Sequence, residues 1–97
     1  MIFERTLSIK NADAPRACTL TIGEFRTRPN GDAEVDVAIR GLFAADWQVA
    51  IVGIDPLQAL LHAIRIARAA LEGTPEFRSG ELRWLGHPGH GLDLIKE

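Results

Sequence analysis

Residues 55–73 of the sequence read DPLQALLHAIRIARAALEG, and this stretch decides the fold. Asp55 suits an N-cap, the proline after it suits the first helical position, and Gln58 completes a capping box three residues after the cap. At the other end, Gly73 is a natural C-cap. The stretch therefore predicts one long helix over residues 56–72.

The apolar side chains of this helix cover more than half of its circumference. One face carries the larger side chains, and we expect it to press onto a sheet: Leu57, Leu60, Leu61, Ile64, Ala67 and Leu71. A second arc carries mostly alanine: Ala59, Ala63, Ile66 and Ala70. A helix on one sheet needs a narrower apolar stripe, so the C-terminal segment or a second copy should cover this arc. We predict that the residues of this arc contact a partner. Trp84 is a further predicted interaction residue, because an exposed tryptophan would be a good candidate for a binding hot spot.

The sequence before the helix predicts four strands separated by turns. Three of these show the alternation of apolar and polar residues that is typical of half-buried strands, at residues 2–10, 18–22 and 35–39. The fourth, residues 47–53, is apolar on both faces because Ala50 and Val52 lie between its larger side chains. This pattern predicts a central strand that is covered on both sides.

A short strand at residues 82–85 follows the helix. Sequential strands are usually neighbours, so the first four should form a meander, with this last strand returning to an edge. The predicted fold class is α+β: an antiparallel sheet of four to five strands, in the order β-β-β-β-α-β, packed against the helix. We expect a single domain over residues 1–97, since one core typically serves a chain of this length.

The composition indicates a soluble protein of the cytoplasm. The net charge is −2, and the 11 basic residues are spread along the chain, which argues against nucleic acid as a partner. No apolar run approaches the length of a membrane span, and the start of the chain lacks the features of a signal peptide. A single cysteine, Cys18, excludes an internal disulfide and suits a reducing compartment; its apolar strand predicts a place in the core.

Histidines near the C-terminus are the first candidates for metal chemistry. The candidate ligands are His87, His90, His62 and Asp93, and Cys18 could join them. The spacing is not that of a known metal motif, and the surrounding glycines suit an exposed loop in which histidine is simply tolerated. We therefore predict no metal and no cofactor.

Acidic pairs and glycines do not indicate a catalytic site either. Glu34 and Asp36 lie two apart on a predicted strand, and the alternation of a solvent-facing strand explains them. Gly86, Gly89 and Gly91 lack the Lys-Ser/Thr that follows in a P-loop. The prediction is that the protein is not an enzyme.

Two motifs in residues 47–92 carry a resemblance to a protein family. They are G-x-D-x-x-Q-A-L at residues 53–60, and L-x-W-L-G at residues 82–86 followed by Gly91-Leu92. The chain resembles a family of short, uncharacterised bacterial proteins that is classed as a domain of unknown function. It departs from the family pattern after Gly91, where we would expect an aromatic residue. The resemblance implies a fold and no activity.

The predicted function is that of a non-catalytic protein-interaction module, with an accessory, immunity-like or antitoxin-like role. The small domain, the surplus apolar helix surface and the lack of a convergent catalytic set favour this class. Its partner would be another protein or a second copy in a homodimer, with no nucleic acid and no membrane. The alternative is a small metal-binding protein or enzyme that uses the C-terminal histidines.

Overall fold

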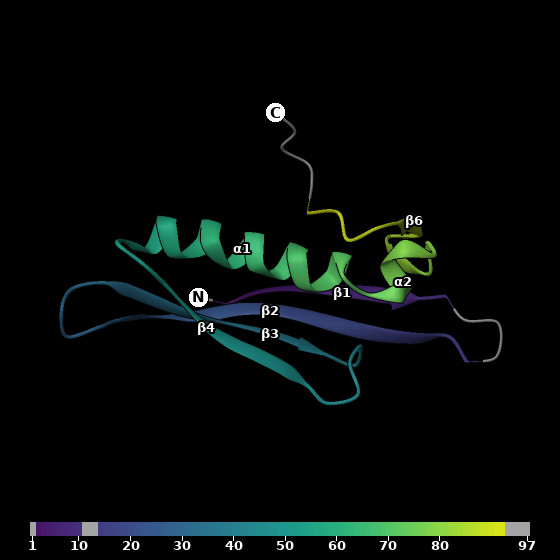
Figure 1. Ribbon diagram of the computed structural model, residues 1–97, viewed down its shortest axis with the longest axis horizontal. Coiled ribbons are helices and arrows are strands. Elements are labelled where there is room, and N and C mark those ends of the chain that lie inside the picture. The colour runs from purple at the N-terminus through teal and green to yellow at the C-terminus, as the bar shows by residue number, and fades with distance from the viewer. Residues whose placement is uncertain (1, 11–13, 93–97) are drawn as a thin grey trace.

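The fold is one antiparallel sheet with a long helix lying across one of its faces (Figure 1). It is seen in a computed structural model that describes residues 2–10 and 14–92. The elements in chain order are β1 Phe3–Ile9, β2 Arg16–Thr27, β3 Ala33–Arg40, β4 Trp47–Gly53, α1 Pro56–Glu72, α2 Pro75–Arg78, β5 Leu82–Trp84 and β6 His87–Pro88. The predicted α+β class and the antiparallel sheet are confirmed.

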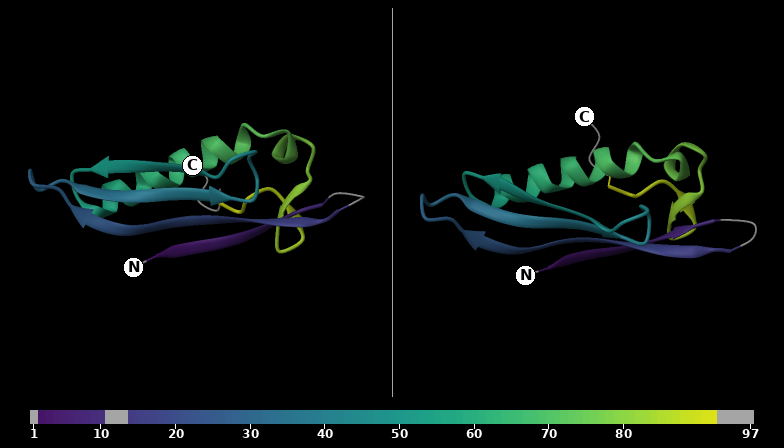
Figure 2. Two further views of the ribbon diagram at one scale, coloured as in Figure 1. Left: turned by 90° about the horizontal axis from the view of Figure 1, so that it is seen from below. Right: turned by 60° about the horizontal axis from the view of Figure 1, so that its bottom comes forward.

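The strand order across the sheet is β4-β3-β2-β1-β5-β6, so the first four strands form the predicted meander (Figure 2). The sheet has six strands, where four to five were expected. The difference is β6, because His87 and Pro88 pair with Trp84 and Arg83 in a terminal hairpin. Only Ser8 and Ile9 of β1 pair with β5.

Strand β4 lies at the edge of the sheet, and the prediction that it is central is wrong. It pairs along its whole length with β3 and ends the strand order. The apolar pattern on its two faces therefore does not reflect two covering layers. Ala50 remains exposed on the outer face, beside Val52, which is partly buried.

Helix α1 begins and ends where its capping residues predict. The backbone N–H of Gln58 donates to Oδ1 of Asp55 at 2.8 Å, and the N–H of Ile54 donates to Oε1 of Gln58 at 2.7 Å. The first bond satisfies a free donor of the first helical turn, and the second resembles a capping box but reaches Ile54, the residue before the N-cap. Gly73 is the C-cap, so the predicted limits of 56–72 are confirmed. No helix among the described residues is long and apolar enough to span a membrane.

The helix presents its alanines to the sheet, and the predicted orientation of its leucine face is wrong in part. The fully buried helix residues are Ala59, Ala63, Ala67 and Leu71, whereas Leu57 and Leu61 are 64% and 55% exposed. Small side chains allow the helix to lie close to the strands: a Cβ added to Gly53 would lie 2.4 Å from the backbone nitrogen of Ala59. The sheet itself therefore covers most of the arc expected to need another cover.

The core lies between α1 and the inner face of the sheet. It is aliphatic, with these fully or nearly fully buried members from the strands: Leu7, Ile9, Cys18, Leu20, Ile22, Val35, Val37, Ile39 and Leu82. Cys18 is a core residue as predicted, and burial raises the pKa of its thiol. The thiol is thus held in its unreactive neutral form.

Candidate interaction surface

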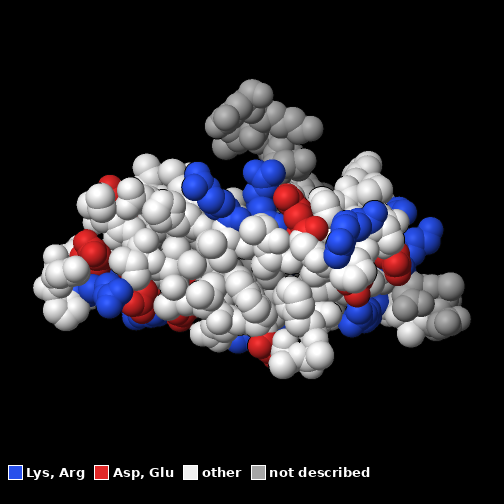
Figure 3. All heavy atoms as spheres, in the orientation of Figure 1, with Lys and Arg blue, Asp and Glu red and all other residues white. Residues whose placement is uncertain are grey.

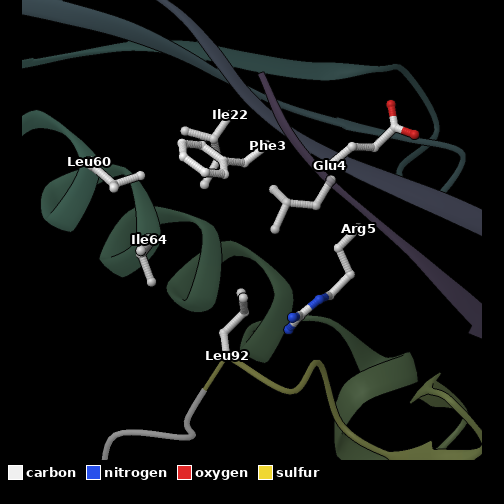
Figure 4. Close-up of a pocket in the computed structure, with 8 residues that line it drawn as sticks. Phe3, Glu4, Arg5, Ile22, Leu60, Ile64 and Leu92 are labelled. Atoms are coloured by element: carbon white, nitrogen blue, oxygen red, sulfur yellow. The ribbon is translucent and has the colours of Figure 1, made fainter. Parts of the chain in front are cut away.

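An open apolar groove lies between α1 and β1. Its volume is about 280 Å³, and Figure 4 shows most of its lining: Phe3, Glu4, Arg5, Leu20, Ile22, Leu60, Ile64 and Leu92. The carboxylate of Glu4 points away from the helix in this view, so the walls are formed mainly by aliphatic and aromatic side chains. We call this feature the α1–β1 groove.

The groove exists because the helix does not extend over β1. Helix α1 contacts β3 and β4 most extensively and β2 less. The inner side of β1 near Phe3 therefore has no helix above it, and Phe3 is 43% exposed. Among the described residues, β1 from Phe3 to Leu7 also has a strand neighbour on the β2 side only, because its pairing with β5 starts at Ser8.

A stripe of large aliphatic side chains forms the helical rim of the groove. Leu57, Leu60, Leu61 and Ile64 follow the i, i+3, i+4, i+7 spacing that places side chains on one side of a helix. Leu60 and Ile64 point into the groove, and the exposed Leu57 and Leu61 continue the same surface outward. We call these four residues the leucine stripe. Phe3 lines the same groove as Leu60 and Ile64.

Arg5 closes one end of the groove, and its charge is already engaged. Its Nη1 donates to the backbone oxygen of His90 at 3.1 Å, and its guanidinium lies 3.9 Å from the ring centre of Trp84. Stacking on an indole and a bond to a carbonyl both stabilise a guanidinium in a fixed position. Arg5 thus fastens the C-terminal loop to β1.

His90 fastens the same loop to the end of α1. Its side chain is buried, and Nε2 lies 2.6 Å from Oε2 of Glu72. Its Nδ1 accepts the N–H of Leu92 at 2.9 Å, which leaves Nε2 as the ring nitrogen that donates to Glu72. The hydrogen bond from His90 holds the pKa of Glu72 below its usual value, and Arg68 adds to this effect. Phe77 stacks on the imidazole at 5.3 Å.

The candidate metal ligands within the described residues are not brought together. His62 is exposed on α1 and His87 is exposed in β6, whereas His90 is buried with both ring nitrogens in hydrogen bonds. Asp93 lies outside the described residues. Within residues 2–10 and 14–92, no group of three or more His, Cys, Asp or Glu side chains could hold a metal ion.

A cluster of charges lies on the outer face of the sheet, and it is an ion-pair network. Both terminal nitrogens of Arg26 bond to Asp36 at 3.0 Å, and Arg26 also pairs with Glu34. The guanidinium lowers the pKa of the Asp36 carboxyl and keeps it ionised. Because each carboxylate pairs with the same arginine, the cluster offers neither a general acid nor a free base.

A search against protein families finds one match that spans nearly all of the described chain. Residues 3–94 match the family Domain of unknown function (DUF6968). The chain belongs to the DUF6968 family. No curated protein and no solved structure matches the chain.

The residues that suggested a resemblance have structural roles in this DUF6968 domain. Gly53 leaves space for the backbone of Ala59, and Asp55 and Gln58 cap the helix. Gly91 lies against the ring of Trp84, since a Cβ there would come within 2.1 Å of the indole. Helix capping and close packing account for these residue types.

The predicted interaction residues differ in how deeply they are buried in the DUF6968 domain. Ala59 and Ala63 are fully buried between the helix and the sheet. Ala70 and Trp84 are partly buried, the latter beneath Arg5. Ile66 remains 37% exposed beside β4.

The sequence interpretation missed the uncovered side of the helix, although its signal was present. The leucine stripe was recognised as apolar but was assigned to the core, because larger side chains usually make the larger hydrophobic contribution. Phe3 shares its strand parity with Leu7, which is buried, yet Phe3 lies beyond the reach of the helix. The groove depends on how far the helix extends across the sheet, and residue patterns do not encode that distance directly.

Proposed function

We propose that this DUF6968 protein is a non-catalytic protein-interaction module, and that the leucine stripe and the α1–β1 groove form its contact surface. The observation that carries the proposal is the exposure of Leu57 and Leu61, at 64% and 55%, beside an open apolar groove. Large aliphatic side chains that gather on a surface next to a cavity are typical of protein-binding sites.

The groove fits an apolar segment of a partner protein better than a small polar ligand. Its side chains are mostly carbon, and the cation at its end is held by His90 and Trp84. The β1 backbone from Phe3 to Leu7 lies beside the groove and could pair with an extended segment, which is a common mode of peptide recognition. Alternate side chains of that segment would then enter the groove.

We further propose the setting in which the module works. The single cysteine is buried and reduced, which supports a role in a reducing cytoplasm. Within the class of interaction modules, we favour an accessory, immunity-like or antitoxin-like role in a bacterium, with a protein partner and with self-association as a homodimer. The small size of the chain and its apolar contact surface support this choice.

An affinity capture with matched variants tests the proposed contact surface. The purified protein, Leu61→Glu and Ala69→Glu are used as baits, and each captured protein is then purified and titrated calorimetrically against all three. Ala69 is also exposed on α1, but it lies away from the leucine stripe. We expect Leu61→Glu to weaken the dissociation constant at least about 10-fold, or about 1.4 kcal/mol, and Ala69→Glu to leave it nearly unchanged. Equal binding by the two variants would contradict the proposed surface.

A further inference from the structure

Strand β4 presents a long edge without the features that usually protect sheet edges. Its sequence WQVAIVG, at Trp47–Gly53, holds no charged residue and no proline. Its pairing with β3 runs through seven consecutive residue pairs without a bulge. Natural edge strands are normally short, charged, bulged or interrupted by proline, because an open edge can pair with another chain.

The opposite end of the sheet differs in these respects. The outermost strand there, β6, has only two residues, and one of them is Pro88, which has no N–H to donate. β4 is therefore the long, regular edge of this sheet among the described residues. The difference between the two ends favours a closed pair of β4 strands over an open chain of molecules.

The surface beside the β4 edge is mostly apolar, and Arg65 is the charged residue that lines it. Figure 3 shows this side of the molecule, where a largely uncharged area lies below a group of blue and red side chains at the upper centre. A hollow of about 360 Å³ lies between the edge and α1, lined by Ala50, Ile51, Val52, His62, Arg65 and Ile66. An added strand would place its inward side chains at this hollow, next to Ile66 and Ile51.

We propose that β4 pairs antiparallel with β4 of a second copy, about a two-fold axis at Ala50, so that two sheets become one continuous sheet. This inference deepens the self-association part of the proposed function and uses a surface separate from the α1–β1 groove. The α1–β1 groove remains open on both copies of the pair.

The sequence of β4 is self-complementary in this register. With Ala50 opposite Ala50 of the second copy, Val49 lies opposite Ile51 on the inner face, and Gln48 lies opposite Val52 on the outer face. No β4 side chain is charged, and the inner pairs are β-branched residues, which favour cross-strand packing. Val49 of each copy then fills the hollow beneath Ile66 of the other.

The proposed pairing also accounts for the two apolar faces of β4. Val49 and Ile51 are only partly buried on the inner face, and Ala50 and Val52 are apolar on a face that is mostly polar. An edge strand exposed to water normally has a polar outer face. A neighbouring strand from a second copy would cover these side chains on both faces.

Oligomeric state measured with charge variants at Ala50 tests the proposal. Sedimentation equilibrium is run from about 1 to about 200 μM, a range that brackets the dissociation constants of small interfaces. We expect the unmodified protein to dimerise and Ala50→Lys to weaken the dimer at least about 10-fold, because two lysines would meet at the axis. Thr6→Lys, an exposed outer-face change on β1, should leave the dimer intact.

A mixture of oppositely charged variants tests the register. Ala50→Lys and Ala50→Glu should each be mainly monomeric, yet an equal mixture should form a heterodimer, because residue 50 lies opposite itself. Far-ultraviolet circular dichroism and thermal unfolding verify that each variant is folded. A monomeric unmodified protein, a dimer that survives Ala50→Lys, or folded variants that fail to combine would each overturn the proposal.

The two proposed surfaces can be tested independently of each other. Ala50→Lys should keep the binding of any partner captured through the leucine stripe, and Leu61→Glu should keep the dimer. Loss of dimerisation in Leu61→Glu, with Ala50→Lys still dimeric, would overturn the β4 pairing. A dimer that persists in Leu61→Glu and is lost in Ala50→Lys would support the β4 pairing, whether or not the α1–β1 groove binds a partner.

Discussion

The Nε2 atom of His90 lies 2.6 Å from Oε2 of Glu72, a contact that ties the C-terminal loop to the last turn of α1. The other ring nitrogen accepts the N–H of Leu92, and Phe77 stacks on the ring. Because Leu92 lines the α1–β1 groove, this buried imidazole sets where the groove ends. His90 therefore has a positioning role in the fold.

Replacement of His90 tests this role. We expect His90→Ala to lower the free energy of unfolding by about 2–4 kcal/mol, because it leaves a cavity beside Phe77 and removes two hydrogen bonds. Urea unfolding followed by tryptophan fluorescence measures the loss. His87→Ala, an exposed change in the neighbouring strand β6, should alter the stability by less than about 0.5 kcal/mol. Equal losses of unfolding free energy in His90→Ala and His87→Ala would contradict the positioning role of His90.

The stability of the protein should fall in acid partly through Glu72. The pKa of Glu72 is below its usual value in the folded protein, chiefly because of the bond from His90. A carboxyl with a depressed folded pKa binds fewer protons when folded, so its contribution is present above the unfolded pKa and is lost as the pH falls through the folded one. Urea unfolding at several pH values below about 5 measures this loss.

Glu72→Gln is the matched variant for the acid effect. It keeps a hydrogen-bond acceptor near His90 but cannot titrate, so its stability should depend less steeply on pH in the acidic range. At neutral pH the variant should be the less stable of the two proteins. An unchanged slope would show that other carboxyl groups, such as Asp36 beside Arg26, account for the acid effect.

The helix and the meander could be predicted from the sequence because local signals fix them. Asp55 and Gly73 mark the helix ends, and side-chain alternation marks the strands. The position of β4 could not be predicted in this way. Two apolar faces can mean two covering layers or an edge that pairs with another chain, and a single sequence does not separate these meanings. The extra strand β6 was missed because two residues carry no periodicity.

The candidate surface could be predicted only as a surplus of apolar residues on the helix. The sequence showed that the apolar arc was too wide for one sheet, and that inference is confirmed by the exposure of Leu57 and Leu61. It did not show which side of the arc the sheet would cover. The close approach of Gly53 to Ala59 decides that orientation, and it is a contact of backbone with backbone.

Two alanine substitutions on α1 test the orientation of the helix directly. Leu71 is fully buried, so Leu71→Ala should lower the free energy of unfolding by about 2–5 kcal/mol. Leu61 is 55% exposed, so Leu61→Ala should change it by less than about 0.5 kcal/mol. Chemical denaturation of both variants is the measurement. A large loss in Leu61→Ala would mean that the leucine stripe packs within the fold.

Two glycines that flank α1, Gly53 at the end of β4 and Gly73 at the C-cap, test the close packing of the helix start. Gly53→Ala should destabilise the fold by about 1–3 kcal/mol, because its Cβ would lie 2.4 Å from the backbone nitrogen of Ala59. Gly73 has ordinary helical angles, and the nearest atom to an added Cβ is 3.4 Å away. Gly73→Ala should therefore stabilise by about 0.4–1 kcal/mol. Thermal unfolding measures the stability of both variants. Equal losses of stability in Gly53→Ala and Gly73→Ala would contradict the close packing of Gly53 against Ala59.

The hairpin between β5 and β6 turns at Leu85, which has a left-handed backbone and a 77% exposed side chain. Leu85 has a φ of 52° and Gly86 one of 82°, angles that suit Asn-Gly in a two-residue turn. Leu85→Asn should raise the free energy of unfolding by about 0.5–1 kcal/mol, because asparagine tolerates this conformation at lower cost.

Leu85→Val is the matched control for this turn, because a β-branched side chain is disfavoured at positive φ and should lower the stability. Both variants lose the exposed leucine side chain, and they differ in how well the new residue tolerates a positive φ. Calorimetric unfolding of the two variants therefore separates the effect of backbone strain from the effect of losing the leucine. If both variants were destabilised alike, the leucine side chain would itself contribute to the fold. If Leu85→Asn alone raised the unfolding temperature, backbone strain at Leu85 would be shown to destabilise the unmodified protein.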